Sequence, residues 1–237
     1  MQDRPVAMVT GASSGIGLAT SQLLSRTGYT VVMVARRTEP LARTGQSLQG
    51  PWTPLPADVG DLVQARAAVD QVVQTFGRLD VLVNNAGYAP LLPIDRTDDG
   101  TIEQTYRINA MGPAAMIAQA WPTFRAQGSG CIVNISTIGT DDPFPGFFAY
   151  AASKAALNVM VRSCATEGAS IGVRAFAVAP GAVETPMLRA MFDEQQIPPE
   201  ACLTPEAVAE VVLACIEGTR DCDNGKVIWL PGPESVS

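Results

Sequence analysis

The chain has 237 residues, of which 47 % are hydrophobic and 16 % are charged, with a net charge of −7. This length suits one large α/β domain, so we predict a single domain over residues 1–237. The acidic balance, with no basic cluster larger than Arg36-Arg37, argues against a nucleic-acid partner. No apolar run approaches the ~20 residues that a membrane span needs. Since the residues before the first strand are too few for a signal peptide, we expect a cytoplasmic protein.

The chain contains no histidine. It therefore lacks the commonest general base and metal ligand, and proton chemistry must come from tyrosine, lysine, cysteine or carboxylate groups. The cysteines are odd in number and show no C-x-x-C spacing. This favours reduced thiols over a disulfide framework or a zinc site, so no metal is predicted.

Short apolar segments alternate with helical periodicity along the chain. In chain order, the apolar runs predict strands over residues 6–9, 31–34, 81–83, 131–135, 172–178 and 226–230. Helical spacing is clearest over residues 16–24 and 62–76. Continuous apolar strands separated by helices indicate a parallel sheet covered on both faces. We predict a doubly wound α/β fold of about seven strands.

A glycine-rich turn, residues 10–17, lies between the first strand and the first helix. Its spacing is G-x-x-x-G-x-G, and glycines there let a pyrophosphate approach the backbone amides at a helix N-terminus. The same turn contains G-x-S-x-G from Gly11 to Gly15, which is typical of serine hydrolases. Such an enzyme needs a base to activate Ser13, normally a histidine, and the chain has none. The hydrolase alternative is therefore disfavoured.

Tyr150 and Lys154 are four residues apart in a segment that favours helix, so their side chains share one face. The pKa of a free tyrosine, ~10, is too high for a base at neutral pH. A neighbouring ammonium favours the phenolate and should lower that pKa. The pair therefore has the chemistry of an acid/base couple, although Y-x-x-x-K alone is a common coincidence.

The order of these motifs resembles that of the short-chain dehydrogenase/reductase family from about residue 6 to residue 187. The motifs that carry the resemblance are Gly11, Gly15 and Gly17, then Asp58-Val59, Asn84-Asn85-Ala86-Gly87, Asn109, Tyr150 with Lys154, and Pro180-Gly181. The resemblance implies a Rossmann-like fold and an oxidoreductase that moves hydride between a nicotinamide cofactor and a carbonyl or secondary alcohol. It also implies a homodimer or homotetramer.

By this resemblance, Tyr150 is the general acid/base, and Lys154 holds the nicotinamide ribose and lowers the pKa of Tyr150. The family's catalytic serine lies thirteen residues before the tyrosine, where this chain has Thr137. Neighbouring Ser136 would point to the opposite face of a strand. We therefore expect Thr137 to hydrogen-bond the substrate oxygen.

Asn109 matches the family's asparagine whose main-chain carbonyl holds a water in a proton relay. Pro113 follows four residues later and has no N–H to donate to that carbonyl. We predict that the carbonyl is free and that the helix is kinked there. The alternative is that Pro113 merely marks a helix boundary.

The resemblance also implies a set of cofactor-binding residues. They are Gly11, Ser13, Gly15, Ile16, Gly17, Asp58, Val59, Asn85, Ala86, Gly87, Tyr150, Lys154, Pro180, Gly181, Val183 and Thr185. Arg36 and Arg37 follow the second strand, where an acidic residue would bind the ribose of NAD and an arginine the 2′-phosphate of NADP. The family's second basic signal would fall at Ser14 and is missing. NADP is the predicted cofactor, with NAD the alternative.

Residues 186–203 lie where the family carries a mobile substrate lid. Their apolar side chains, Met187, Leu188, Met191 and Phe192, would either close over the site and exclude water or simply pack a short helix. Further pocket walls are expected from Tyr88, Phe144 and Phe147, with Asp141 and Asp142 near the mouth.

The end of the chain, residues 224–232, matches the family only approximately. Because this region commonly builds a subunit interface, the oligomer rests on resemblance alone. Two further functions stay open: a non-catalytic, cofactor-binding regulator, and a dehydratase or epimerase of the same family.

Overall fold

The computed structural model describes residues 4–232, which contain one seven-stranded sheet with every neighbouring pair of strands parallel. The strand order is β3-β2-β1-β4-β5-β6-β7. The strands are β1 (Val6–Thr10), β2 (Thr30–Ala35), β3 (Trp52–Pro56), β4 (Val81–Asn84), β5 (Gly130–Ile135), β6 (Val173–Pro180) and β7 (Val227–Leu230). The predicted doubly wound α/β fold is confirmed.

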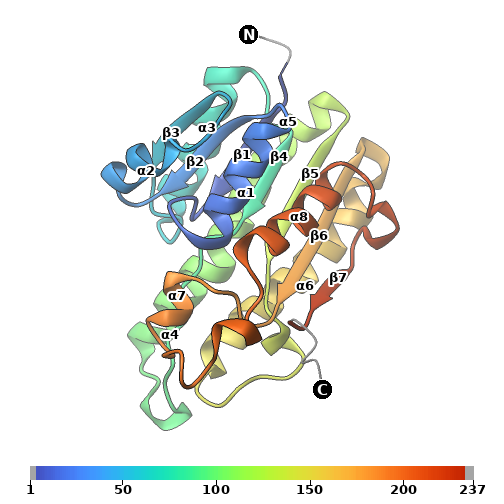
Figure 1. The fold of residues 1–237 in the computed structure, drawn as a ribbon. Coiled ribbons are helices and arrows are strands. Elements are labelled where there is room, and N and C mark those ends of the chain that lie inside the picture. The colour runs from blue at the N-terminus through green and yellow to red at the C-terminus, as the bar shows by residue number, and fades with distance from the viewer. Residues whose placement is uncertain (1–3, 233–237) are drawn as a thin grey trace.

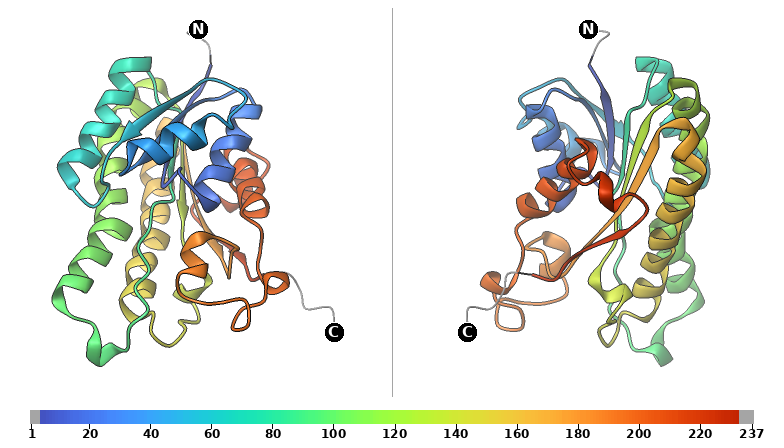
Figure 2. Two further views of the ribbon diagram at one scale, coloured as in Figure 1. Left: turned by 60° about the vertical axis from the view of Figure 1, so that its left-hand side comes forward. Right: turned by 90° about the vertical axis from the view of Figure 1, so that its right-hand side faces the viewer.

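Helices cover both faces of the sheet (Figures 1 and 2). One face carries α1 (Gly15–Arg26), α2 (Thr38–Gly45) and α8 (Pro205–Ile216). The other carries α3 (Leu62–Phe76), α5 (Gly112–Gln127) and α6 (Phe148–Gly168). The shorter α4 (Asp99–Tyr106) leads toward α5, and α7 (Pro186–Arg189) lies beyond the end of β6. Among the described residues, no helix is both long and apolar enough to cross a bilayer.

The central strands are mostly apolar because they are buried on both sides. Buried Asn84 and Asn134 are exceptions in β4 and β5, and the Asn84 Nδ2 donates to the Asn134 Oδ1 at 2.8 Å. In β1, Val6 and Met8 pack into the core beneath α3 and α5, whereas Ala7 and Val9 pack into the core beneath α1 and α8. Alternate side chains of one strand thus belong to two separate hydrophobic cores. This double burial fixes the register of β1 between β2 and β4.

The strand β3 was not among the six that the apolar runs predict. It contains Pro54 and Pro56, which lack an N–H and argue against a strand on sequence grounds. β3 lies at the edge of the sheet and pairs only with β2. An edge position tolerates proline, because a missing donor there interrupts no second ladder.

The sheet extends from β1 in two directions, through β2 to β3 on one side and through β4 to β7 on the other. Chain connections leave the carboxyl ends of β1 and β4 toward opposite faces of the sheet, and such a switch point opens a crevice. The glycine turn and the segment after β4 meet at this edge, which places the candidate site.

Candidate active site

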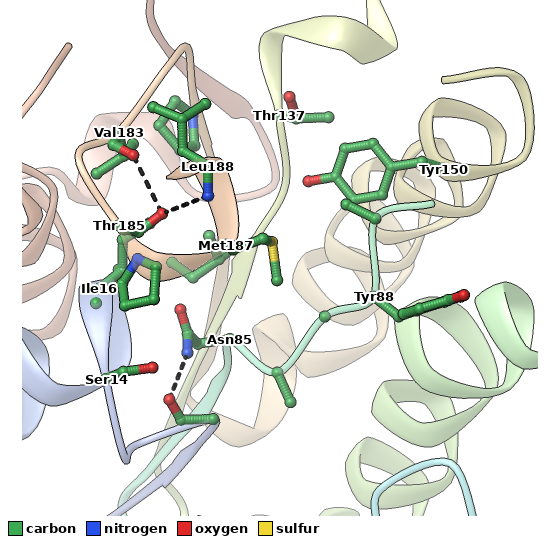
Figure 3. Close-up of a pocket in the computed structure, with 18 of the residues that line it drawn as sticks. Ser14, Ile16, Asn85, Tyr88, Thr137, Tyr150, Val183, Thr185, Met187 and Leu188 are labelled. Carbon is green, nitrogen blue, oxygen red and sulfur yellow. Dashed lines mark hydrogen bonds between the residues drawn. The ribbon is translucent and has the colours of Figure 1, made fainter. Parts of the chain in front are cut away.

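A cavity of about 720 Å³ lies at the carboxyl ends of β1, β4, β5 and β6 (Figure 3). Its lining includes every predicted site residue except Gly17 and Asn109, which are buried behind it. The expected walls from Tyr88, Phe144, Phe147 and the 186–203 segment also line it, whereas Asp141 and Asp142 do not. Ile138 and Ile197 line it too, without any motif that would have revealed them.

The glycine turn is held against the end of β4 by Asn85. Its side-chain amide donates to the carbonyls of Thr10 (2.8 Å) and Gly11 (3.3 Å), and its backbone N–H donates to the Thr10 hydroxyl (2.9 Å). Gly11 has φ 66°, a left-handed conformation that favours glycine. Gly17 acts by close approach, since a Cβ there would lie 2.4 Å from the Gly11 oxygen. Asn85 therefore shapes the turn as well as lining the cavity.

Tyr150 and Lys154 both reach the cavity from α6. Burial raises the pKa of the Tyr150 phenol to about 12, and hydrogen bonding with Thr137 lowers it by a smaller amount. The Lys154 Nζ lies 6.0 Å from the centre of the tyrosine ring and donates to the carbonyl of Ile135 at 2.7 Å. The expectation that Lys154 brings the pKa of Tyr150 below its usual value is therefore wrong for this structure, because desolvation dominates.

Lys154 is 3 % exposed, and this burial lowers the pKa of its ammonium to about 8. Because the unfolded lysine has the higher pKa, 10.5, the unfolded state binds more protons between these values and stability rises with pH there. We expect the wild type to gain about 2 kcal/mol over a Lys154→Met variant between about pH 7.5 and about pH 9.5. Urea unfolding of both proteins without cofactor measures this difference.

The matched control is Lys226→Met, which makes the same chemical change at an exposed position. Its stability difference from the wild type should stay flat over the same pH window. A flat difference for Lys154→Met as well would contradict the lowered pKa.

Thr137 and Ser136 follow β5 and both line the cavity. Thr137 interacts with the Tyr150 phenol, and its Oγ1 accepts from the backbone N–H of Gly139 at 3.2 Å. The Ser136 hydroxyl is buried and makes no hydrogen bond within the described residues. Thr137, the residue chosen by register, is therefore the hydroxyl beside the tyrosine (Figure 3).

Asn109 is fully buried, and its side chain is committed to neighbouring groups. Its Oδ1 accepts from the backbone N–H of Tyr88 and its Nδ2 donates to the Tyr88 carbonyl, both at 2.8 Å. Its Nδ2 also donates to the Ser153 hydroxyl at 2.9 Å. Asn109 thus fixes the segment after β4 to α6.

The chain around Asn109 is not a regular α-helix. Residues 107–111 are π-helical, and the Gly112 N–H donates to the Arg107 carbonyl, five residues back. Pro113 follows directly and supplies no donor. The expected irregularity before Pro113 is present, while a free Asn109 carbonyl that binds water stays a prediction.

The segment 186–203, here called the lid segment, forms a closed loop beside the cavity. Val183 pairs with Leu203 at its base, and Thr185 caps α7 by accepting from the Leu188 N–H at 3.2 Å. Arg189 stabilises the lid segment from within by an ion pair to Glu184 and by donating to the Ile197 carbonyl at 2.7 Å.

Aromatic rings connect the lid segment to the tyrosine. Phe192 packs edge-on against Phe147, with ring centres 6.3 Å apart, and Phe147 packs against Tyr150 at 5.3 Å. The Met187 side chain extends toward the space between the two sides of the cavity (Figure 3). The segment is therefore a wall of the site, and its motion as a lid stays a prediction.

The exposed Arg36 and Arg37 line the end of the cavity that follows β2. Asp58 lies at the same end and accepts from the Gly60 N–H at 2.9 Å, which orders the turn after β3. Within the described residues, no group of three or more cysteine, histidine or acidic side chains could hold a metal ion.

The doubly wound sheet with a cavity at its switch point defines a class, the dinucleotide-binding α/β proteins. Comparison with known proteins identifies the family within this class, because the short chain dehydrogenase family model matches residues 5–196. The chain belongs to the short-chain dehydrogenase/reductase family.

Two relatives and one solved structure illustrate the similarity. The 3-oxoacyl-(acyl-carrier-protein) reductase FabG of Thermotoga maritima is 34 % identical over 236 residues, covering 96 % of each chain. The cis-4-hydroxycyclohexanecarboxylate dehydrogenase of Sinomonas cyclohexanicum is 36 % identical, covering 96 % of this chain and 95 % of the relative. The structure of 3-ketoacyl-(acyl-carrier-protein) reductase from Brucella melitensis, complexed with NADH, gives a TM-score of 0.90 at 25 % identity over 98 % of both chains.

Proposed function

We propose that the protein is an NADP(H)-dependent oxidoreductase that interconverts a carbonyl and a secondary alcohol. The observation that carries the proposal is the meeting of Tyr150, Lys154 and Thr137 in the cavity that the glycine turn also lines. Membership of a family of oxidoreductases supports it. A single cavity can thus serve both a dinucleotide and a small substrate.

The residues present fit a dinucleotide. Glycines at positions 11 and 17 let the turn pack closely against Asn85, since a Cβ at either position would lie within 2.7 Å of its Nδ2. The turn places the N-terminus of α1 at the cavity. Arg36 and Arg37 would bind the 2′-phosphate, with Asp58 and Val59 along the adenine and residues 85–87 lining the cofactor cleft after β4. Residues 180–185 would orient the carboxamide. When bound, the cofactor supplies or accepts the hydride.

The protein's own groups handle the proton and the substrate oxygen. The Tyr150 phenol, whose pKa burial raises, carries its proton at neutral pH and can donate it to the carbonyl oxygen in a reduction. Thr137 would donate to the same oxygen and fix its position. Lys154 would hold the ribose hydroxyls.

Cofactor preference is tested by fluorescence titration with NADPH and, separately, NADH. We expect NADPH to bind at least ~10-fold more tightly, since paired guanidinium contacts to a phosphate contribute more than 1.4 kcal/mol. The Arg36→Ala/Arg37→Ala double variant should lose this preference while keeping its affinity for NADH. Equal binding of both cofactors by the wild type would show that the arginines do not contact the 2′-phosphate.

The role of Thr137 is tested by three substitutions. Thr137→Ala should lower kcat by ~10²-fold, because one donor to the reacting oxygen is lost. Thr137→Ser should retain most of the activity, and Ser136→Ala should change little. The opposite ranking of Thr137→Ala and Ser136→Ala in steady-state assays would show that the register is wrong.

A further inference from the structure

The charges that surround the cavity are distributed unevenly. Among the described residues that line it, the cationic ones are Arg36, Arg37 and Lys154. The two arginines follow β2, at the end proposed for the adenosine phosphate. The Lys154 ammonium is buried and donates to the Ile135 carbonyl at 2.7 Å. With the arginines at the adenosine end and Lys154 assigned above to the ribose hydroxyls, none of the three is left for a group on the substrate side.

The substrate side is formed by three segments, residues 85–89, 136–150 and 181–197, which supply its lining from Asn85 to Ile197. Their sequences contain one cation, Arg189, and five acids: Asp141, Asp142, Glu184, Asp193 and Glu194. Arg189 does not line the cavity, because its guanidinium is committed to the Glu184 carboxylate and the Ile197 carbonyl. A substrate anion would therefore meet no free positive charge on these three described segments.

The exposed acids that adjoin lining residues of this side along the chain, Asp141, Asp142 and Asp193, are here called its rim. Asp141 and Asp142 are exposed and lie between two lining residues, Gly139 and Phe144, along the chain. On the lid segment, exposed Asp193 is fixed by accepting from two backbone N–H groups, the nearer at 2.8 Å. Such a rim repels anions before they enter.

The interior of the same side is apolar and rich in rings. Phe147 and Phe192 pack edge-on, Leu188 is buried, and Ile138 and Met191 complete the wall. Flat apolar bodies pack well against such ring edges and faces. The polar groups that remain near Tyr150 suit one carbonyl oxygen.

We propose, on the basis of the function proposed above, that the substrate is an uncharged cyclic or aryl ketone, or the corresponding alcohol, and that carboxylated or phosphorylated carbonyl compounds are rejected. An anion placed on this side would lose its hydration without gaining a cationic partner, which is costly in an apolar cavity. Selectivity thus comes from missing positive charge as much as from shape.

The test compares matched substrates that differ only in one substituent. Methyl 4-oxocyclohexanecarboxylate, the primary amide and the free carboxylate share the same ring, and an aryl series built in the same way extends the panel. With NADPH, we expect kcat/KM for the ester to exceed that for the carboxylate by ~10²-fold. The neutral amide should lie near the ester, which separates charge from polarity.

A charge placed on the lining should reverse the effect. Gln196 lines the cavity, whereas its exposed neighbour Gln195 does not. Gln196→Arg should raise kcat/KM for the carboxylate ~10-fold, by supplying a partner for the anion. Gln195→Arg, with the same change in net charge, should have a much smaller effect.

Two outcomes overturn the inference in distinguishable ways. Equal or better turnover of the carboxylate by the wild type would refute the substrate class while leaving the oxidoreductase function intact. Absence of NADPH oxidation across the whole panel, with NADPH still bound, would refute the proposed function and this inference together.

Discussion

Tyr150→Phe is expected to lower kcat by ~10³-fold or more, because general acid/base catalysis contributes ~10²–10⁴ and no histidine can take over the proton transfer. The substitution removes only the hydroxyl and keeps the ring that packs against Phe147 at 5.3 Å. The fold and the NADPH affinity should therefore be preserved. Steady-state NADPH oxidation and fluorescence titration of the same preparation measure the two properties separately.

The same experiment distinguishes the functions that the sequence leaves open. A cofactor-binding regulator would bind NADPH but turn over no ketone, and Tyr150→Phe would then change nothing. An epimerase or dehydratase would leave the redox state of the cofactor unchanged over a complete turnover. Undiminished NADPH oxidation by the Tyr150→Phe variant would show that the tyrosine has no part in the reaction.

The sequence predicts the central sheet well because its strands are buried on both faces. Double burial makes β1 and β5 predominantly apolar, with runs such as residues 6–9 and 131–133. The sequence does not predict the edge strand β3, because Pro54 and Pro56 argue against a central strand. At the edge of the sheet, where β3 pairs only with β2, proline is tolerated. The sequence pattern predicts a strand most clearly where packing permits the fewest residue types.

Motif spacing likewise predicts which residues meet in the cavity, but not how they interact there. The direction of the pKa shift of Tyr150 depends on desolvation, which the spacing of Tyr150 and Lys154 does not reveal. The bonds of Asn109 to Tyr88 and Ser153 join elements far apart in the chain. These features depend on tertiary distances and appear only in three dimensions.

At Gly17, the sequence motif and the packing together predict that any side chain would disturb both the fold and cofactor binding. A Cβ at residue 17 would lie 2.4 Å from the Gly11 oxygen and 2.5 Å from the Asn85 Nδ2. Neither group can retreat easily, because Gly11 is backbone and Asn85 is bonded to the Thr10 carbonyl at 2.8 Å. We expect Gly17→Ala to lower the free energy of unfolding by ~1–3 kcal/mol through overpacking. Affinity for NADPH should fall ~10-fold or more, since the displaced turn forms the proposed phosphate site.

Gly100→Ala is the matched control, because Gly100 is also helical but has free space around it. A Cβ at residue 100 would meet its nearest atom, the Asp98 Oδ1, at 3.7 Å, an ordinary contact. Alanine there should be neutral or stabilise α4 by ~0.5–1 kcal/mol, since glycine loses more backbone entropy on folding. Urea unfolding and NADPH titration of both variants give the comparison. If Gly17→Ala matched Gly100→Ala in both, the glycine would be needed for neither the turn nor the cofactor, and the phosphate site would have to lie elsewhere.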